Sequence, residues 1–258
     1  MNRSWRFTET EFFALWQHVT TDYHPAPFLF TTRTSAHREF EEEKRQALAD
    51  LDHRLGPDFR AGIAEMARPD IRITAFGVDE TVRGESPAVR VRVLATRKGS
   101  RGYTIVQHPG ESYWYGGGYT ITECEAVSIG KAVVDLLPAC EPGRHSEIPL
   151  PSAPAPTEQN APARIFAAAG ASASRLHRDF MSPSACAGTI EVAQGDSIYG
   201  PDGLISRTLT WRDVPGDGRY AVNDTTARTA TPVTADRLVS MVNARVSTIV
   251  KALRAERS

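Results

Sequence analysis

The chain has 258 residues, and its 30 Lys and Arg against 31 Asp and Glu leave a net charge of −1. At roughly 150 residues per domain this length predicts one large domain or two halves, and 41% apolar with 24% charged residues is an ordinary globular composition. The balanced charge argues against a nucleic-acid binder, which needs a basic surface, and against a polybasic membrane-surface protein.

The sequence predicts neither an export signal nor membrane insertion. Residues 1–6 are not followed by an apolar run, and polar residues interrupt the longest apolar-leaning segment, residues 127–137, well short of the about 18 residues of a span. The three cysteines, Cys124, Cys140 and Cys186, form no CxxC pair and are odd in number. We therefore expect reduced thiols and a cytoplasmic protein.

Three helices and a short strand are expected first. Residues 8–11 form a capping box, in which a hydroxyl and a carboxylate satisfy each other's backbone amides, and apolar residues follow at helical spacing to Val19. A second helix is predicted over residues 35–55. Asp58 is expected to cap a third helix, and residues 28–31 predict a short strand between the first two.

Four strands are expected next, over residues 71–76, 89–93, 103–107 and 113–123. Alternation in the second of them predicts that its three valines face the core and that Arg90 and Arg92 face solvent. Gly116 to Gly118 interrupt the fourth strand and predict a bend or a close backbone approach. Residues 122–125 match a second capping box, which would open a helix that ends before Pro138.

Residues 138–162 hold seven of the 17 prolines and predict an extended connector. An Ala-rich helix is expected over residues 163–180, and strands then follow over residues 188–193, 204–211 and 219–222. Thr234 is expected to cap a final helix. The apolar stripe of that helix consists of Leu238, Val242, Val246, Ile249 and Leu253.

The two halves, residues 1–137 and 163–258, share one order of elements: a helix, several strands with Gly turns, and a capped helix. Short local connections favour antiparallel pairing, and helices at the ends of the strand runs favour an α+β fold. We therefore expect one domain of two pseudo-repeat halves with a continuous antiparallel sheet. The side chains expected to line that sheet are Val91, Val93, Ile105, Ile190, Leu209 and Trp211.

The sequence contains no recognisable catalytic, metal or cofactor motif. Its seven histidines form no HxH, HExxH or HxxxH pattern, and GxSxG and SxxK are absent. Gly116 to Gly118 lack the GK[ST] that follows in a phosphate loop. An enzyme would need a site assembled from distant residues such as Cys124 and His108, and we keep such a hydrolase or transferase as the alternative function.

Four aromatic side chains gather around the three glycines: Tyr113, Trp114, Tyr115 and Tyr119. Successive residues of a strand face opposite sides, so these rings do not all enter one core. Two interpretations stay open, an anchor for a protein partner or an aromatic ladder that stabilises a hairpin. The final helix around Met241 and Arg245, with its basic outer face, is a second candidate surface for a partner.

Several short motifs occur along nearly the whole chain, and their order resembles that of a known family. The first half carries Phe12-Phe13-Ala14-Leu15-Trp16, then Pro27-Phe28-Leu29-Phe30, then Met66-Ala67-Arg68-Pro69-Asp70. The second half carries Trp211-Arg212-Asp213, then Gly218-Arg219-Tyr220, then Val233-Thr234-Ala235-Asp236-Arg237-Leu238. Together they resemble the EspG family, the secretion-associated proteins of actinobacterial type VII (ESX) systems.

The resemblance implies an α+β fold with a central antiparallel sheet, flanking helical bundles and quasi-two-fold halves. It also implies a cytoplasmic, non-enzymatic chaperone without a cofactor, which binds the hydrophobic tip of a helical PE–PPE-like heterodimer and keeps it soluble before export. A second copy of the chain is a further candidate partner, and a structural subunit of a larger assembly is a third candidate function. We expect at least one of the four aromatic residues around the glycines to be exposed and to contact the client.

Overall fold

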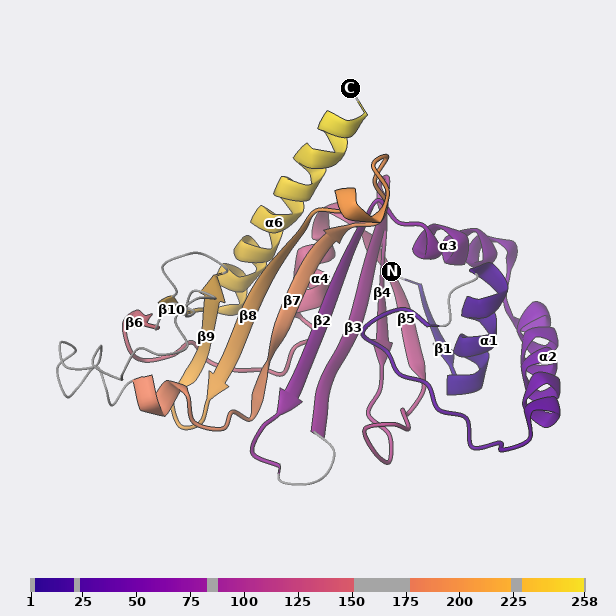
Figure 1. Ribbon diagram of the computed structural model, residues 1–258, viewed down its shortest axis with the longest axis horizontal. Helices are drawn as coiled ribbons and strands as arrows, with labels where there is room; N and C mark the ends of the chain where they lie inside the picture. The colour runs from indigo at the N-terminus through magenta and orange to yellow at the C-terminus, as the bar shows by residue number, and fades with distance from the viewer. Residues whose placement is uncertain (1–2, 21–23, 83–87, 151–176, 224–228, 258) are drawn as a thin grey trace.

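The structure is a computed structural model, and it describes residues 3–20, 24–82, 88–150, 177–223 and 229–257. Within these ranges ten strands form one sheet in the order β1-β5-β4-β3-β2-β7-β8-β9-β10-β6 (Figure 1). All neighbouring strands pair antiparallel. The predicted α+β fold with a continuous antiparallel sheet is thus confirmed.

The strands are β1 (Ser4–Phe7), β2 (Ile71–Asp79), β3 (Ala88–Lys98), β4 (Arg101–Gln107), β5 (Tyr119–Glu125), β6 (Ile148–Pro149), β7 (Cys186–Gln194), β8 (Ser206–Val214), β9 (Gly218–Asn223) and β10 (Thr229–Pro232). The α-helices are α1 (Glu9–Val19), α2 (His37–Arg54), α3 (Pro57–Ala67), α4 (Ile129–Val134) and α6 (Ala235–Glu256). Residues 177–180 are also helical. Short 3₁₀ turns lie at η1 (Ala126–Ser128) and η3 (Pro201–Gly203).

Helices α4 and α6 pack on the face of the sheet that points away from the viewer in Figure 1, called here the rear face. The hydroxyl of Thr234 accepts a hydrogen bond from the amide of Arg237, which begins α6 as predicted. The whole predicted stripe of α6 is buried, in a core that it shares with Ile73 of the first half and Trp211 of the second. This core joins both halves because both contribute side chains to it. Burying each such side chain stabilises the fold by roughly 1.5–3 kcal/mol.

Helices α1 and α3 cover the opposite, front face of β1, β3, β4 and β5 (Figure 1). The predicted capping box is present, with the amide of Glu11 bonded to the Thr8 hydroxyl and the amide of Thr8 bonded to the Glu11 carboxylate. Ile105 belongs to this front core, whereas Val91 and Val93 face the rear core. Helix α2 packs outside α1 and buries only Leu51 among its own residues.

Three local predictions for the first half are wrong. Residues 28–31 form no strand, because Phe28 and Phe30 instead pack against Phe12 and Phe13 of α1. Asp58 does not cap α3: Gly56 holds the N-cap position and Pro57 occupies the first turn, where its missing N–H costs nothing. Residues 122–125 form no capping box, because they pair with β1 and β4 as part of β5.

Part of the predicted connector belongs to the sheet. β6 pairs with β10 at the edge, and Pro142 forms a parallel bridge with Arg219 of β9. The Ala-rich helix expected over residues 163–180 falls mainly outside the described residues, which include only its last positions. The sequence patterns also missed the short strands β1, β6 and β10.

Candidate functional site

The predicted aromatic cluster lies at the end of β4 and β5, at the lower edge of the sheet in Figure 1. Contrary to the prediction, Tyr113, Trp114 and Tyr115 are not in a strand: they belong to the loop of residues 108–118, called here the aromatic loop. β5 begins only at Tyr119. Backbone bonds from the amide of Gly117 to the carbonyl of His108 and from the amide of His108 to the carbonyl of Gly118 close the loop.

Tyr119 is a core residue and not part of an exposed surface. It is 1% exposed, and its ring stacks on Phe12 with centroids 4.0 Å apart. Its hydroxyl lies 2.9 Å from Nε2 of His24. Burial raises the pKa of this phenol, so Tyr119 stays protonated and acts through packing and hydrogen bonding.

The aromatic loop is held by Arg92 of β3. This arginine was predicted to face solvent, but it is 5% exposed. Its Nη2 donates to the carbonyl of Tyr113 at 2.9 Å and its Nη1 donates to Oε1 of Gln107 at 3.2 Å, while the guanidinium lies 4.8 Å from the centre of the Tyr113 ring. Burial lowers the pKa of Arg92. Alternation alone could not predict this, because the loop that covers Arg92 comes from a distant part of the chain.

The half-buried carboxylate of Glu9 completes this network. The side-chain amide of Gln107 donates to both oxygens of Glu9 and to the carbonyl of Leu29. Burial raises the pKa of Glu9 and is the largest of the influences on that pKa. The amide of Gly118 points at Glu9 Oε1 at 3.1 Å. This amide therefore already serves a protein carboxylate, which argues against the phosphate cradle that the three glycines could otherwise form.

Trp114 is the exposed tip of the loop. It is 53% exposed, and its ring meets Tyr113 edge-on at 4.9 Å between centroids. Tyr115 is half-buried under the guanidinium of Arg33, 4.5 Å from the ring centre, and Arg33 also pairs with Glu111 at 2.7 Å. The loop thus presents one large apolar side chain from a support fixed by two arginines.

Met241 and Arg245 lie on α6, behind the sheet and away from the aromatic loop (Figure 1). Met241 is half-buried against the rear core. Arg245 donates from Nε to the carbonyl of Thr208 and from Nη1 to the carbonyl of Met241, at 3.1 and 3.0 Å. Arg245 therefore ties α6 to β8. The structure does not bring Met241 and Arg245 together with the aromatic loop.

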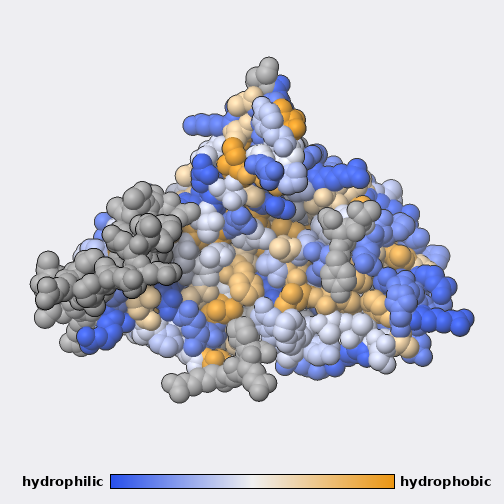
Figure 2. Space-filling view, viewed as in Figure 1, coloured by the Kyte–Doolittle hydropathy of each residue, from blue (hydrophilic) through white to orange (hydrophobic). Residues whose placement is uncertain are grey.

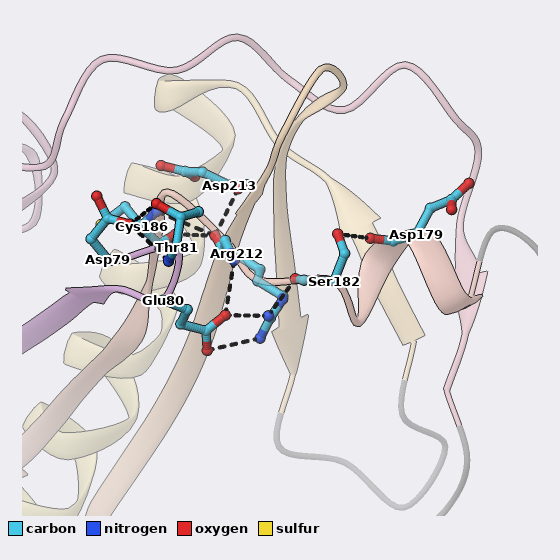
Figure 3. A network of polar contacts seen from close by, with 9 residues as sticks. Asp79, Glu80, Thr81, Asp179, Ser182, Cys186, Arg212 and Asp213 are labelled. Atoms are coloured by element: carbon cyan, nitrogen blue, oxygen red, sulfur yellow. Dashed lines mark hydrogen bonds and ion pairs between the residues drawn. The ribbon is translucent and has the colours of Figure 1, made fainter. Parts of the chain in front are cut away.

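A polar network at the lower ends of β2 and β8 fastens the segment of residues 181–184 (Figure 3). Glu80 pairs with Arg212, whose guanidinium also donates to the carbonyl of Ser182. The amide of Ser184 donates to Glu80 at 3.0 Å. The Ser184 hydroxyl bonds the backbone carbonyls of Cys186 and Asp213, so it serves the backbone and is not an activated nucleophile.

Within the described ranges, no group of three or more His, Cys, Asp and Glu side chains is placed to hold a metal ion. No helix in the described part of the chain is both long enough and apolar enough for a membrane span.

Comparison with known proteins identifies the family. The model of the EspG family matches residues 8–244. The chain belongs to the EspG family. The resemblance inferred from the order of its short motifs is therefore confirmed.

The solved structures add a likeness in fold to this EspG-family chain. One of them is the Mycobacterium tuberculosis type VII secretion system chaperone EspG5 in complex with a PE25–PPE41 dimer. It superposes with a TM-score of 0.57 at 17% identity and covers 96% of both chains, which shows a shared fold. No curated protein sequence matches the chain.

The alternative enzymatic site is not assembled in this EspG-family protein. Cys124 lies opposite Gly102 at one end of β4, whereas His108 follows Gln107 at the other end. Gly102 and His108 are six residues apart along the chain, or about 20 Å in extended backbone. Burial first, and then Glu123, raise the pKa of the Cys124 thiol to about 11, so it is not a ready thiolate. The hydrolase or transferase hypothesis finds no support.

Proposed function

We propose that this chain is a cytosolic, non-enzymatic chaperone of a type VII (ESX) secretion system. In this proposal it binds the hydrophobic tip of a helical PE–PPE-like heterodimer and keeps that client soluble until export, without a cofactor. The observation that carries the proposal is the likeness in fold, over 96% of both chains, to EspG5 solved with a PE25–PPE41 dimer. Membership of the EspG family supports the same conclusion.

The client surface that we propose is the lower edge of the sheet. Three exposed apolar side chains belong to it: Val82, Trp114 and Met181, which are 48%, 53% and 56% exposed. Val82 and Met181 flank the Glu80–Ser184 contact at the end of β2. Trp114 belongs to the loop whose Tyr113 lines a hollow together with Ala88 at the start of β3. Apolar side chains left exposed at this edge are candidates for burial by a partner.

Trp114 is the anchor that this surface offers. Burying apolar area yields about 25 cal/mol per Å², and part of that gain is lost in ordering flexible groups. The Arg92 contacts to Tyr113 reduce this loss, since they fix the backbone next to Trp114 before the client arrives. A rigid, exposed tryptophan is the residue type most enriched among interface hot spots.

The test is client capture by Trp114→Ala. Co-purification and titration with a PE–PPE-like pair should show binding weakened by about 2 kcal/mol or more, with an unchanged melting temperature, because Trp114 is half exposed. Tyr199→Ala is the matched control. Tyr199 is 72% exposed on the β7–β8 hairpin, at the opposite end of those strands, and its replacement should leave binding intact.

Unchanged binding by Trp114→Ala would remove this edge as the client surface, and the surface around Met241 and Arg245 would be tested next. Failure of every PE–PPE-like pair to bind the unaltered chain would contradict the chaperone function itself. Light scattering of the chain alone tests the remaining partner, a second copy of the same chain. We expect the dimer, if present, to dissociate when the client is added, since both compete for the apolar edge.

A further inference from the structure

The glycines that close the aromatic loop bring its backbone against α1 and β1. A Cβ atom at Gly116 would overlap Oε1 of Glu9 and would lie 2.7 Å from Nε2 of Gln107. Gly118 has a φ of +91°, and a Cβ atom there would lie 2.6 Å from the carbonyl oxygen of Phe7. Side chains at these two positions would push the loop outward, so glycine is needed for the close approach.

One carboxylate receives this end of the loop. Glu9 begins α1 on the front face, which Figure 2 shows with apolar side chains along its middle and hydrophilic ones toward both ends. Its Oε1 accepts from the amide of Gly118 at 3.1 Å and from Nε2 of Gln107 at 3.2 Å, and its Oε2 accepts from the same Nε2 at 3.0 Å. Hydrogen bonds to an ionised acceptor are about twice as strong as neutral ones.

The charged and titratable side chains that face Glu9 come from the elements packed against it. They are Arg92 of β3, Tyr119 of β5 and, through the Tyr119 hydroxyl, His24. Arg54 of α2 pairs instead with Glu11, at 3.2 Å. Burial raises the pKa of Glu9 above its usual value of 4.5 and outweighs the hydrogen bonds and the charge of Arg92, which lower it.

We propose that Glu9 is a positioning residue for the aromatic loop. Its carboxylate fixes the end of the loop at Gly118, as Arg92 fixes the carbonyl of Tyr113. Gln107 joins the two supports, since its Nε2 donates to Glu9 and its Oε1 accepts from Arg92. Trp114 therefore stands between two fixed points. The inference rests on the proposed client surface and deepens it, because a side chain of α1 then sets how well Trp114 is presented.

The first measurement is amide hydrogen exchange of the full chain at pH 7. The amides of Gly117 and Gly118, which bond to the carbonyl of His108 and to Glu9, report on the loop. Glu9→Ala should speed their exchange about tenfold or more, and Glu9→Gln, which keeps an acceptor oxygen, should restore part of the protection. Glu39→Ala, at an exposed position of α2, is the control and should change neither amide. Unchanged exchange in Glu9→Ala overturns the proposal.

A double-mutant cycle tests the same contact from the side of the loop. Gly116→Ala should speed loop exchange in the natural chain, because its Cβ displaces the Glu9 side chain, and its effect should be several-fold smaller in Glu9→Ala. Gly117→Ala is the matched control: its Cβ would lie 2.5 Å from the backbone carbonyl oxygen of Pro109, so its effect should not depend on Glu9. Equal effects of Gly116→Ala in both backgrounds count against the proposal.

A pH profile identifies the group that titrates at the loop. The closed loop raises the pKa of Glu9 by burying it, so the closed state binds the proton more tightly, and loop closure should strengthen as the pH falls from 7 toward 4.5. The amide proton shift of Gly118, followed by nuclear magnetic resonance, should titrate with a midpoint above 4.5. The titration should persist in His24→Gln and vanish in Glu9→Gln. A Gly118 signal that does not titrate, or that titrates equally in Glu9→Gln, overturns the proposal.

Client binding is measured separately, with a PE–PPE-like pair that binds the natural chain. Glu9→Ala should weaken binding about three- to tenfold, because the client must then order the loop itself. Faster loop exchange with unchanged client affinity would support Glu9 as the residue that holds the loop and would contradict the proposed client surface. Unchanged loop exchange would contradict the role of Glu9 alone. The two proposals therefore fail in distinguishable ways.

Discussion

The imidazole of His24 lies among aromatic rings, with Phe12 and Phe28 edge-on to it and the Tyr119 hydroxyl on its Nε2. Burial lowers its pKa from 6.5 to about 4, so between these values the unfolded chain binds more protons than the folded protein. Stability is therefore fully present above pH 6.5 and is lost as the pH falls toward about 4, by up to about 3 kcal/mol. Chemical denaturation at several pH values measures this slope.

The variant His24→Gln isolates that slope from those of other groups. The raised pKa of Glu9 gives an opposite contribution, because the folded protein then holds its proton more tightly than the unfolded chain does. The difference between the natural chain and His24→Gln removes this common effect. A difference that stays constant from pH 6.5 down to about 4 would mean that His24 is not the titrating group.

Arg92 is the second residue whose role depends on burial. Replacing it by Met leaves the carbonyl of Tyr113 and the side chain of Gln107 without their donor, which should lower the free energy of unfolding by about 1–3 kcal/mol. Amide hydrogen exchange of residues 109–117 should also speed up. Arg207→Met, at an exposed position of β8, is the control and should change neither quantity. Equal exchange in both variants would show that Arg92 does not hold the aromatic loop.

At the scale of single elements, helix α6 carries the clearest packing prediction. Leu238 is fully buried in the rear core, so Leu238→Ala should cost about 2–5 kcal/mol of stability, measured by denaturant unfolding. Ser247 is exposed on the same helix, and Ser247→Ala should stay within about 0.5 kcal/mol of the natural chain. A small loss in Leu238→Ala would mean that α6 packs on the sheet less closely than the structure indicates.

Elements with a long local pattern were predictable from the sequence, and short elements were not. The capping box at Thr8 and the stripe of α6 are fixed by neighbours within a few residues, so periodicity finds them. β1, β6 and β10 have two to four residues each and exist only through pairing with distant strands. The same nonlocal pairing turned residues 122–125, a good capping-box sequence, into part of β5.

The candidate site was predictable only in part, for a related reason. The residue types around Trp114 indicated an aromatic cluster with at least one exposed member, and Trp114 is exposed. The sequence could not separate it from Tyr119, because the burial of Tyr119 depends on Phe12 and His24 from another part of the chain.

At the scale of the whole molecule, the order of strands is symmetric about the junction of β2 and β7. From β2 outward, one half runs β3, β4, β5, and from β7 outward the other runs β8, β9, β10. Helix α4 follows β5 and α6 follows β10, and the two helices contact each other on the rear face. We propose, on this support, that the chain is one domain of two pseudo-repeat halves, residues 1–137 and 163–258.

A cut between the halves tests this organisation. The β2–β7 ladder runs from Ile71 opposite Gln194 to Val78 opposite Ala187, and the rear core combines side chains of both halves. Each half alone would expose the edge of a central strand together with half of that core, and apolar surface of this kind is costly in water. A protease site inserted among residues 151–162 and then cleaved should therefore give two fragments that remain together on size exclusion at neutral pH. The two fragments are then separated in denaturant. Either fragment should aggregate when the denaturant is removed from it alone, whereas removing the denaturant from a mixture of both should restore the complex. Two soluble fragments that fold independently would show two separate domains, and the proposed single domain would be wrong.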